Sequence, residues 1–151
     1  MSDLKLIALD TEDLQVVSAH VQDAVMKVGE MTFQRPDKRF VAVINRFDWE
    51  RDAVSKKRFK KHYERRRSGL RFERVQAVRT MRIDPTKTND VLSLLAITFE
   101  QTEAPAGRIT LTFSGGMAIE LDVECIEAEL RDLGAAWTTD FRPRHKLNPK
   151  T

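Results

Sequence analysis

Two runs of alternating apolar and polar residues flank Ser114-Gly115-Gly116, and this pattern constrains the fold of the 151-residue chain more than any other. Its apolar positions are Ile109, Leu111 and Phe113 in the first run and Met117, Ile119 and Leu121 in the second. Alternation with a period of two is typical of a strand that buries one face. A glycine pair supplies the positive φ angles that a tight turn requires. The pattern predicts an antiparallel hairpin.

Alternation of the same kind predicts further strands at 4–9, 31–33, 40–47, 70–83 and 91–100, or about seven in all. Short turns join most of them, which favours antiparallel pairing. Within 70–83 the apolar residues change parity between Phe72 and Val75. A shift of one residue exchanges the buried and exposed faces, so we expect a β-bulge near Glu73 and Arg74.

Two segments carry apolar residues at helical spacing. Asp10 is a suitable N-cap for a helix over 11–22, whose apolar positions include Leu14 and Val17. Ile126, Leu130 and Leu133 follow an i, i+4, i+7 pattern, which predicts a C-terminal helix over 123–134. The expected fold is therefore α+β: a strongly bent antiparallel sheet or barrel, with an early helix and a C-terminal capping helix.

Length and composition indicate one domain over 1–137, containing a basic loop at 51–69 and followed by a flexible basic tail over 138–151. No run approaches the roughly 20 apolar residues that a membrane span needs. The N-terminus has no basic stretch followed by an apolar one, so we expect no signal peptide. Cys125 is the single cysteine and points to a reducing compartment. These features predict a cytoplasmic protein.

Charge is segregated along the chain. Residues 51–82 hold thirteen Lys or Arg and three acids, a net charge of +10, whereas the whole chain carries +3. The tail adds +3 from four bases and one acid, which leaves −10 for all other residues. A localised positive field attracts phosphates and acidic surfaces.

The basic segment supports two interpretations. It could contact an acidic protein or a nucleic acid, with Trp49, Phe59 and Tyr63 available for stacking or anchoring. It could equally be a solvated loop that balances the acidic remainder. The bases we expect at such a contact are Lys56, Lys57, Arg58, Lys60, Lys61, Arg65, Arg66, Arg67, Arg71 and Arg74.

Catalytic and metal-binding motifs are missing from the sequence. The three histidines are scattered, and no Cys-x-x-Cys or His-Glu-x-x-His spacing occurs, so we expect no metal site and no cofactor. Asp48 and Glu50 could form a carboxylate pair beside the neighbouring arginines, which would suit a small hydrolase or transferase. No set of nucleophile, base and orienting group supports catalysis. We therefore favour a non-enzymatic interaction module over an enzyme.

Four segments together resemble a known family: 3–10, 45–50, 70–75 and 113–116. They look like an alphaproteobacterial domain family of unknown function, and the resemblance covers most of 3–140. It implies no activity and transfers no site residue. The order of elements is also similar to pleckstrin-homology-like barrels, in which a final helix caps one open end. That second likeness implies binding of lipid headgroups, peptides or proteins, although a fold does not fix a function.

Overall fold

The computed structural model describes residues 4–47 and 65–134 of the chain. One α-helix, α1 (Thr11–His20), and ten strands make up this part. The strands are β1 (Lys5–Ala8), β2 (Val25–Lys27), β3 (Met31–Gln34), β4 (Arg39–Phe47), β5 (Arg65–Phe72), β6 (Val75–Met81), β7 (Val91–Gln101), β8 (Gly107–Phe113), β9 (Ala118–Val123) and β10 (Ala128–Asp132). Short 3-10 turns lie at Val28–Glu30, Arg35–Asp37 and Ser114–Gly116.

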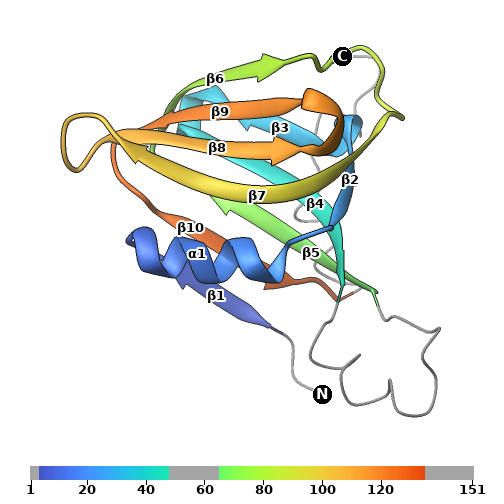
Figure 1. Ribbon diagram of the computed structural model, residues 1–151, viewed down its shortest axis with the longest axis horizontal. Helices are drawn as coiled ribbons and strands as arrows, with labels where there is room; N and C mark the ends of the chain where they lie inside the picture. Colours follow the sequence, from blue (N-terminus) through green and yellow to red (C-terminus); the bar gives the residue numbers. More distant parts are fainter. Residues whose placement is uncertain (1–3, 48–64, 135–151) are drawn as a thin grey trace.

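All ten strands belong to one antiparallel sheet. Its order is β1-β10-β5-β4-β2-β7-β8-β9-β6, and β3 pairs with β4 beside this path. The sheet bends strongly, so that β6, β9, β8 and β7 face β4, β5, β10 and β1, with short β2 joining the two halves (Figure 1). The described part of the chain thus forms an open sheet that ends in β1 on one side and β6 on the other.

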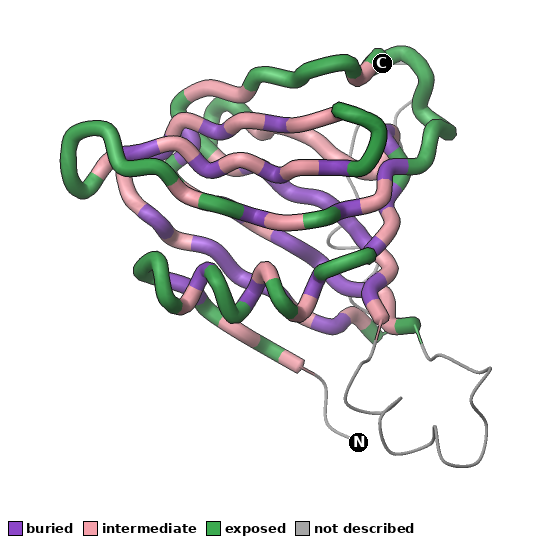
Figure 2. Tube along the Cα trace, in the orientation of Figure 1, coloured by how far each residue is buried: buried purple, intermediate pink, exposed green. Residues whose placement is uncertain are grey.

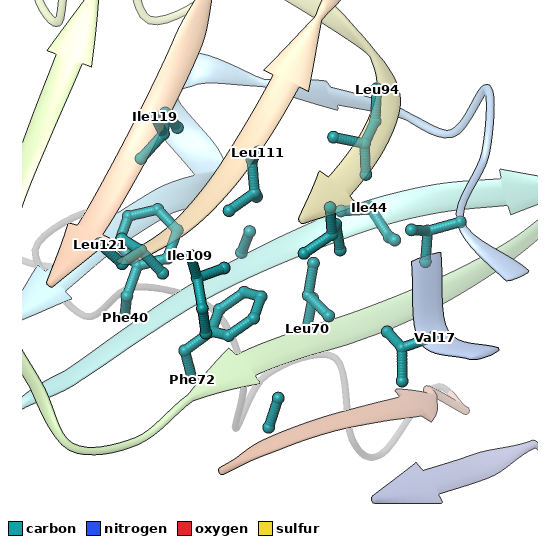
Figure 3. Close-up of a cluster of buried hydrophobic side chains, with 14 of the residues drawn as sticks. Val17, Phe40, Ile44, Leu70, Phe72, Leu94, Ile109, Leu111, Ile119 and Leu121 are labelled. Atoms are coloured by element: carbon teal, nitrogen blue, oxygen red, sulfur yellow. The ribbon is translucent and has the colours of Figure 1, made fainter. Parts of the chain in front are cut away.

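The core fills the space between the two halves of the sheet. Side chains from β4, β5, β7, β8 and β9 point toward one another there (Figure 3). The largest of them, almost all fully buried, are Phe40, Ile44, Leu70, Phe72, Leu94, Ile109, Leu111, Phe113, Ile119 and Leu121. Buried positions alternate along β8 and β9, as Figure 2 shows, whereas β4 is buried on both faces from Phe40 to Ile44.

Helix α1 packs against β7 and β1 at the side where the two halves of the sheet part (Figure 1). The Asp10 carboxylate caps it by accepting from the Asp13 N–H at 2.8 Å. Leu14 and Val17 turn into the core. The Ser18 hydroxyl oxygen accepts from the Ile97 N–H at 2.9 Å, which satisfies a backbone donor of β7. The predicted early helix is confirmed, and its role is to cover β7.

The predicted hairpin around Gly115 and Gly116 is confirmed, and the predicted strands 31–33 and 40–47 form a second hairpin. β8 and β9 pair from Gly107↔Val123 to Thr112↔Ala118, and the turn between them holds Gly115 and Gly116 at φ 80° and 79°. β3 and β4 pair from Met31↔Ala42 to Gln34↔Arg39 around the turn at Arg35–Asp37. These segments were predictable because each strand pairs with its neighbour in sequence.

The predicted C-terminal helix over 123–134 is wrong. Residues 128–132 form strand β10, which lies between β1 and β5 and pairs with both. Ala128, Leu130 and Asp132 face inward, and Glu129 turns to the outer face of the sheet beside Arg71. The spacing of Ile126, Leu130 and Leu133 fits a helix locally, but two long-range strand partners outweigh it.

The single long strand predicted over 70–83 is also wrong, although its change of parity is real. β5 ends at Phe72 and β6 begins at Val75, and Arg74 between them adopts a left-handed φ of 59°. β5 pairs with β4 and β10, whereas β6 pairs with β9 in the other half of the sheet. The parity therefore changes at the corner where the chain passes from one half of the sheet to the other, and not at a bulge within one strand.

Of the two predicted alternatives, an antiparallel bent sheet or a barrel, the described residues form an open antiparallel sheet, with ten strands instead of about seven and no α-helix after α1. The likeness to pleckstrin-homology-like barrels consequently fails on both of its defining features. β5 begins at Arg65, so residues 65–69 of the predicted basic loop belong to a strand. The rest of that loop and the predicted tail lie outside the described residues.

Candidate functional site

The described part of the basic segment runs along β5, around the corner and into β6. Odd-numbered residues of β5 face outward and even-numbered ones face the core, as the burial of Ser68, Leu70 and Phe72 indicates. The arginines of the segment are thus distributed over two faces and two strands. Their surroundings differ accordingly, and each group is described in turn.

A buried polar cluster joins β4, β5 and β10. The Asp132 carboxylate accepts from Arg46 Nε at 3.0 Å and Nη2 at 2.9 Å, and from the Ser68 hydroxyl at 2.8 Å. The backbone N–H of Leu4 donates to it at 3.0 Å. Arg46 is 5% exposed and Asp132 is 4% exposed. This cluster links Leu4, which directly precedes β1, with β4, β5 and β10.

The pKa of Asp132 lies below its ordinary value. Burial alone would raise it, but the hydrogen bonds from Arg46, the Leu4 N–H and the Ser68 hydroxyl outweigh that effect and favour the carboxylate. Every oxygen lone pair is aimed at a donor of the protein itself. The cluster is therefore structural, because the charges of Arg46 and Asp132 neutralise each other.

Two arginines of the basic segment form ion pairs on the outer face of the sheet. Arg67 Nη2 lies 3.2 Å from Glu30, which follows β2. Arg71 Nε lies 3.1 Å from Glu73, and its Nη2 contacts Glu129 of β10. Acids from three different places in the sequence thus neutralise arginines of β5.

Arg74 lies at the corner between β5 and β6. Its guanidinium is 3.3 Å from Glu127 and 3.6 Å from Glu124, and these acids raise its pKa, Glu127 most strongly. Glu124 also accepts from Lys38 at 3.0 Å and from Gln76 at 2.7 Å. A shallow cavity of about 320 Å³ lies here, lined by Asp37, Lys38, Glu73, Arg74, Glu124 and Glu127. Its lining holds four acids and two bases, so it does not favour an anion.

Arg79 of β6 is held by the neighbouring strand β9. It lies 2.9 Å from Asp122 and 3.2 Å from Glu120, and the hydrogen bond to Asp122 is the main cause of its raised pKa. The pKa of Asp122 is lowered in return, chiefly by the same bond. This pair belongs to the solvent-exposed outer face of the sheet.

Arg65 is placed differently from these arginines. It is exposed, and its guanidinium lies 4.8 Å from the centre of the Phe47 ring, a cation–π contact. Phe47 and Arg65 are directly opposite each other in the β4–β5 ladder, and Arg46 and Arg66 form the preceding pair. Both ends of the 48–64 connection are therefore fixed side by side at this end of the sheet.

The remaining predicted contact residues lie outside the described residues. They are Lys56, Lys57, Arg58, Lys60 and Lys61, together with the stacking candidates Trp49, Phe59 and Tyr63. Asp48 and Glu50, the carboxylates of the hydrolase hypothesis, lie there as well. Within residues 4–47 and 65–134, no group of three or more His, Cys, Asp or Glu side chains could hold a metal ion. In the same ranges no helix is long and apolar enough to span a bilayer.

Sequence reasoning identified the bases but not their acidic partners. Glu30, Glu120, Asp122 and Glu129 come from separate parts of the chain, and only the folded sheet brings them beside Arg67, Arg71 and Arg79. The one signal available was the net charge of −10 outside the basic segment and the tail. It indicated that neutralising acids exist without showing which arginines they would reach.

Comparison with known proteins adds a family. No curated protein and no solved structure matches the chain. One family model matches residues 4–145, which include every strand of the sheet and the whole basic segment, and its description is "Protein of unknown function (DUF2948)". This agrees with the family resemblance expected from the sequence and assigns no activity. On the extent of that match, the chain belongs to the DUF2948 family.

Proposed function

We propose that the protein is a non-enzymatic interaction module that contacts a nucleic acid through the part of the basic segment that follows β4 and leads into β5 in the chain. The observation that carries the proposal is the unequal neutralisation of the segment. Arg67, Arg71, Arg74 and Arg79 each have acidic partners within 4 Å. Arg65 instead lies over the Phe47 ring, and the sequence before it supplies five further bases over 53–63, so we place the contact at this end of the segment.

The sequence before Arg65 has the composition that a polyanion contact needs. Residues 53–63 contain five bases and no acid, interleaved with Phe59, His62 and Tyr63. Unpaired bases of a nucleic acid stack on aromatic side chains, with about 1–3 kcal/mol for each stacked base. Lysine and arginine contact phosphates without reading sequence. A contact that tolerates many sequences and prefers single strands follows from this composition.

The pairing of Phe47 with Arg65 supports a local contact surface. Phe47 and Arg65 are paired, so the 48–64 connection leaves the sheet and returns to it at the same point. Arg65 is the first residue of β5 and adds a further positive charge there. The outer faces of β5 and β6, by contrast, carry ion pairs that a partner would have to break.

Fluorescence anisotropy with labelled single-stranded RNA and DNA tests the proposal. Five phosphate contacts should weaken binding to a single strand about 100-fold between about 50 mM and about 200 mM salt. The test variant is Lys60→Glu/Lys61→Glu. The matched control is Lys27→Glu/Lys87→Glu, which makes the same change in net charge at two exposed lysines elsewhere.

The expected result is loss of binding in the test variant and retention in the control. Equal loss in both would mean that only the net charge matters, and it would refute a contact at this segment. Absence of binding by the wild-type protein at low salt would exclude nucleic acid. The acidic protein predicted as the other partner would then be sought by pull-down with the same two variants.

A further inference from the structure

The outer face of β4 and β5 carries a patch of residues that are buried although they point away from the core. The residues of β4 that alternate with Val41 and Val43 belong to the core cluster, whereas these two valines do not. They point to the opposite face of the sheet, yet Val41 is only 5% exposed and Val43 only 1% (Figure 2). Gly69 of β5 pairs with Val43 and is also buried. These three residues form the outer patch.

The other half of the sheet shows how exposed an outer face is when nothing packs on it. Thr110 and Thr112 alternate with core residues of β8 in the same way as the valines, yet neither is buried. The acids differ likewise. Glu129, near the outer patch, is 10% exposed, whereas Asp122 on the other half is 39% exposed. Because a sheet buries a face only by packing it against another part of the protein, the outer patch has a cover.

Ion pairs flank the outer patch and leave a hollow at its centre. Gly69 has no side chain, and its outward neighbours along β5 are Arg67 and Arg71. The two guanidinium groups are paired with Glu30 and Glu129, on the far sides of the patch. Glycine inside a strand often marks a place where another group approaches closely. A hollow floored by valine and glycine suits a flat apolar ring.

We infer that Trp137 of the same chain covers the outer patch. The Leu133 N–H donates to the Arg67 carbonyl at 2.8 Å, so the chain leaves β10 beside β5. A strand spacing of about 4.8 Å and a rise of about 3.3 Å per residue place Gly69 about 8 Å from Leu133. The four residues from Leu133 to Trp137 span up to about 13 Å, which is enough. Gly134 gives the backbone the freedom to turn back toward the patch.

Composition and charge select this segment over 48–64, the other internal stretch outside the described residues. Residues 135–139 are two alanines, Trp137 and two threonines, without a charge, and the family match includes them. Residues 53–63 instead carry five bases and no acid. The ion pairs around the patch hold four arginines and three glutamates, a net charge of +1, which repels a basic segment. They are Arg39, Arg67, Arg71 and Arg131 with Glu30, Glu73 and Glu129.

Tryptophan fluorescence of the full chain tests the inference. Trp49→Phe leaves Trp137 as the single tryptophan. Its emission should be shifted to the blue relative to the urea-unfolded chain, and acrylamide should quench it less, because the ring is buried. Neither property should change on dilution, since the cover belongs to the same chain.

Substitution of Gly69 should change the sign of a stability effect. On an uncovered strand, Gly69→Val should raise the unfolding temperature, because valine favours a strand and glycine weakens it. With Trp137 in the hollow, the added methyl groups displace the ring. The variant should then lower the unfolding temperature by several degrees and shift the Trp137 emission to the red. In the Trp137→Ala background, the same substitution should raise the unfolding temperature.

Thr112→Val, on the outer face of β8, is the matched control and should leave the Trp137 emission unchanged. Trp137 emission and quenching that match those of the unfolded chain overturn the inference. So does a Gly69→Val variant with a higher unfolding temperature and unchanged emission, because the cover is then another segment. Protection that is lost on dilution assigns the cover to a second copy and overturns the assignment to the same chain. Circular dichroism spectra establish that each variant is folded.

Discussion

Replacing Asp132 by Asn should destabilise the protein more than any conservative change at its surface. Asn keeps the volume of the side chain and one carbonyl oxygen, but its NH2 group cannot accept a hydrogen bond. Arg46, Ser68 and the Leu4 N–H all donate to the two carboxylate oxygens of Asp132. The variant therefore turns a donor toward donors and leaves the Arg46 charge without a counter-ion.

The magnitude follows from the burial of both partners. Arg46 and Asp132 side chains are 5% and 3% exposed, and their closest atoms are 2.9 Å apart. Removing one partner of a buried ion pair costs about 3–5 kcal/mol, because the remaining charge is not solvated. A domain of this size has a free energy of unfolding of about 5–15 kcal/mol. The substitution should thus remove at least about a fifth of the free energy of unfolding.

A second variant separates the unpaired charge from lost packing. Arg46→Met/Ser68→Ala/Asp132→Leu removes the whole network and fills its place with apolar groups of similar size. Since no charge remains buried, this triple variant should be more stable than Asp132→Asn, although the Leu4 N–H loses its acceptor. The triple variant should therefore lose less stability than Asp132→Asn, although it removes more interactions.

Urea unfolding followed by far-ultraviolet circular dichroism gives the free energies. Asp90→Asn, at an exposed aspartate, is the control and should change the stability by less than about 0.5 kcal/mol. A loss of less than about 1 kcal/mol in Asp132→Asn would refute the reasoning, because the buried pair would then contribute no more than an exposed one. So would a triple variant less stable than the single one.

Three further predictions concern pH, packing and the surface. The pKa of Asp132 is lowered by folding, so its stabilisation is present above the unfolded value of about 3.9 and is lost as the pH falls through the folded value; acid titrations of wild-type protein and Asp132→Asn should therefore converge below about pH 4. Gly107→Ala should lower the unfolding temperature by several degrees, because a Cβ there would stand 2.3 Å from the Phe99 ring, and a calorimetric scan measures the shift. Arg79→Ala should cost less than about 1 kcal/mol in urea unfolding, since its bonds to Asp122 are solvent-exposed and screened.

The parts of the fold that could be predicted from sequence are those that depend on neighbours in the chain. The β8–β9 hairpin needs Gly115 and Gly116 at positive φ, and helix α1 needs the Asp10 cap; both signals are local. β10 shows the opposite case. Its helical spacing is a local property, whereas its strand conformation depends on pairing with β1 and β5, which are far away in sequence.

The candidate site was predictable in composition but not in geometry. The sequence shows that bases are concentrated in 51–82. It does not show that Arg67, Arg71, Arg74 and Arg79 form ion pairs with acids that lie between 2 and 58 residues away. Arg46 was missed because a single base in an apolar strand resembles a solvent-exposed position. Its inward parity with Phe40, Ala42 and Ile44 is the signal that could have identified it, since an inward charge requires a buried partner.

This division of the arginines changes how the net charge of the segment should be interpreted. A value of +10 over 51–82 counts ion-paired and unpaired bases alike, but a partner responds to the field that remains after neutralisation. The acids that hold Arg71 and Arg79 belong to β9, β10 and the β5–β6 corner, so they assemble only when the sheet forms. Folding therefore changes how the positive charge is distributed over the segment. It pairs Arg67, Arg71, Arg74 and Arg79 with acids, which a count along the sequence does not indicate.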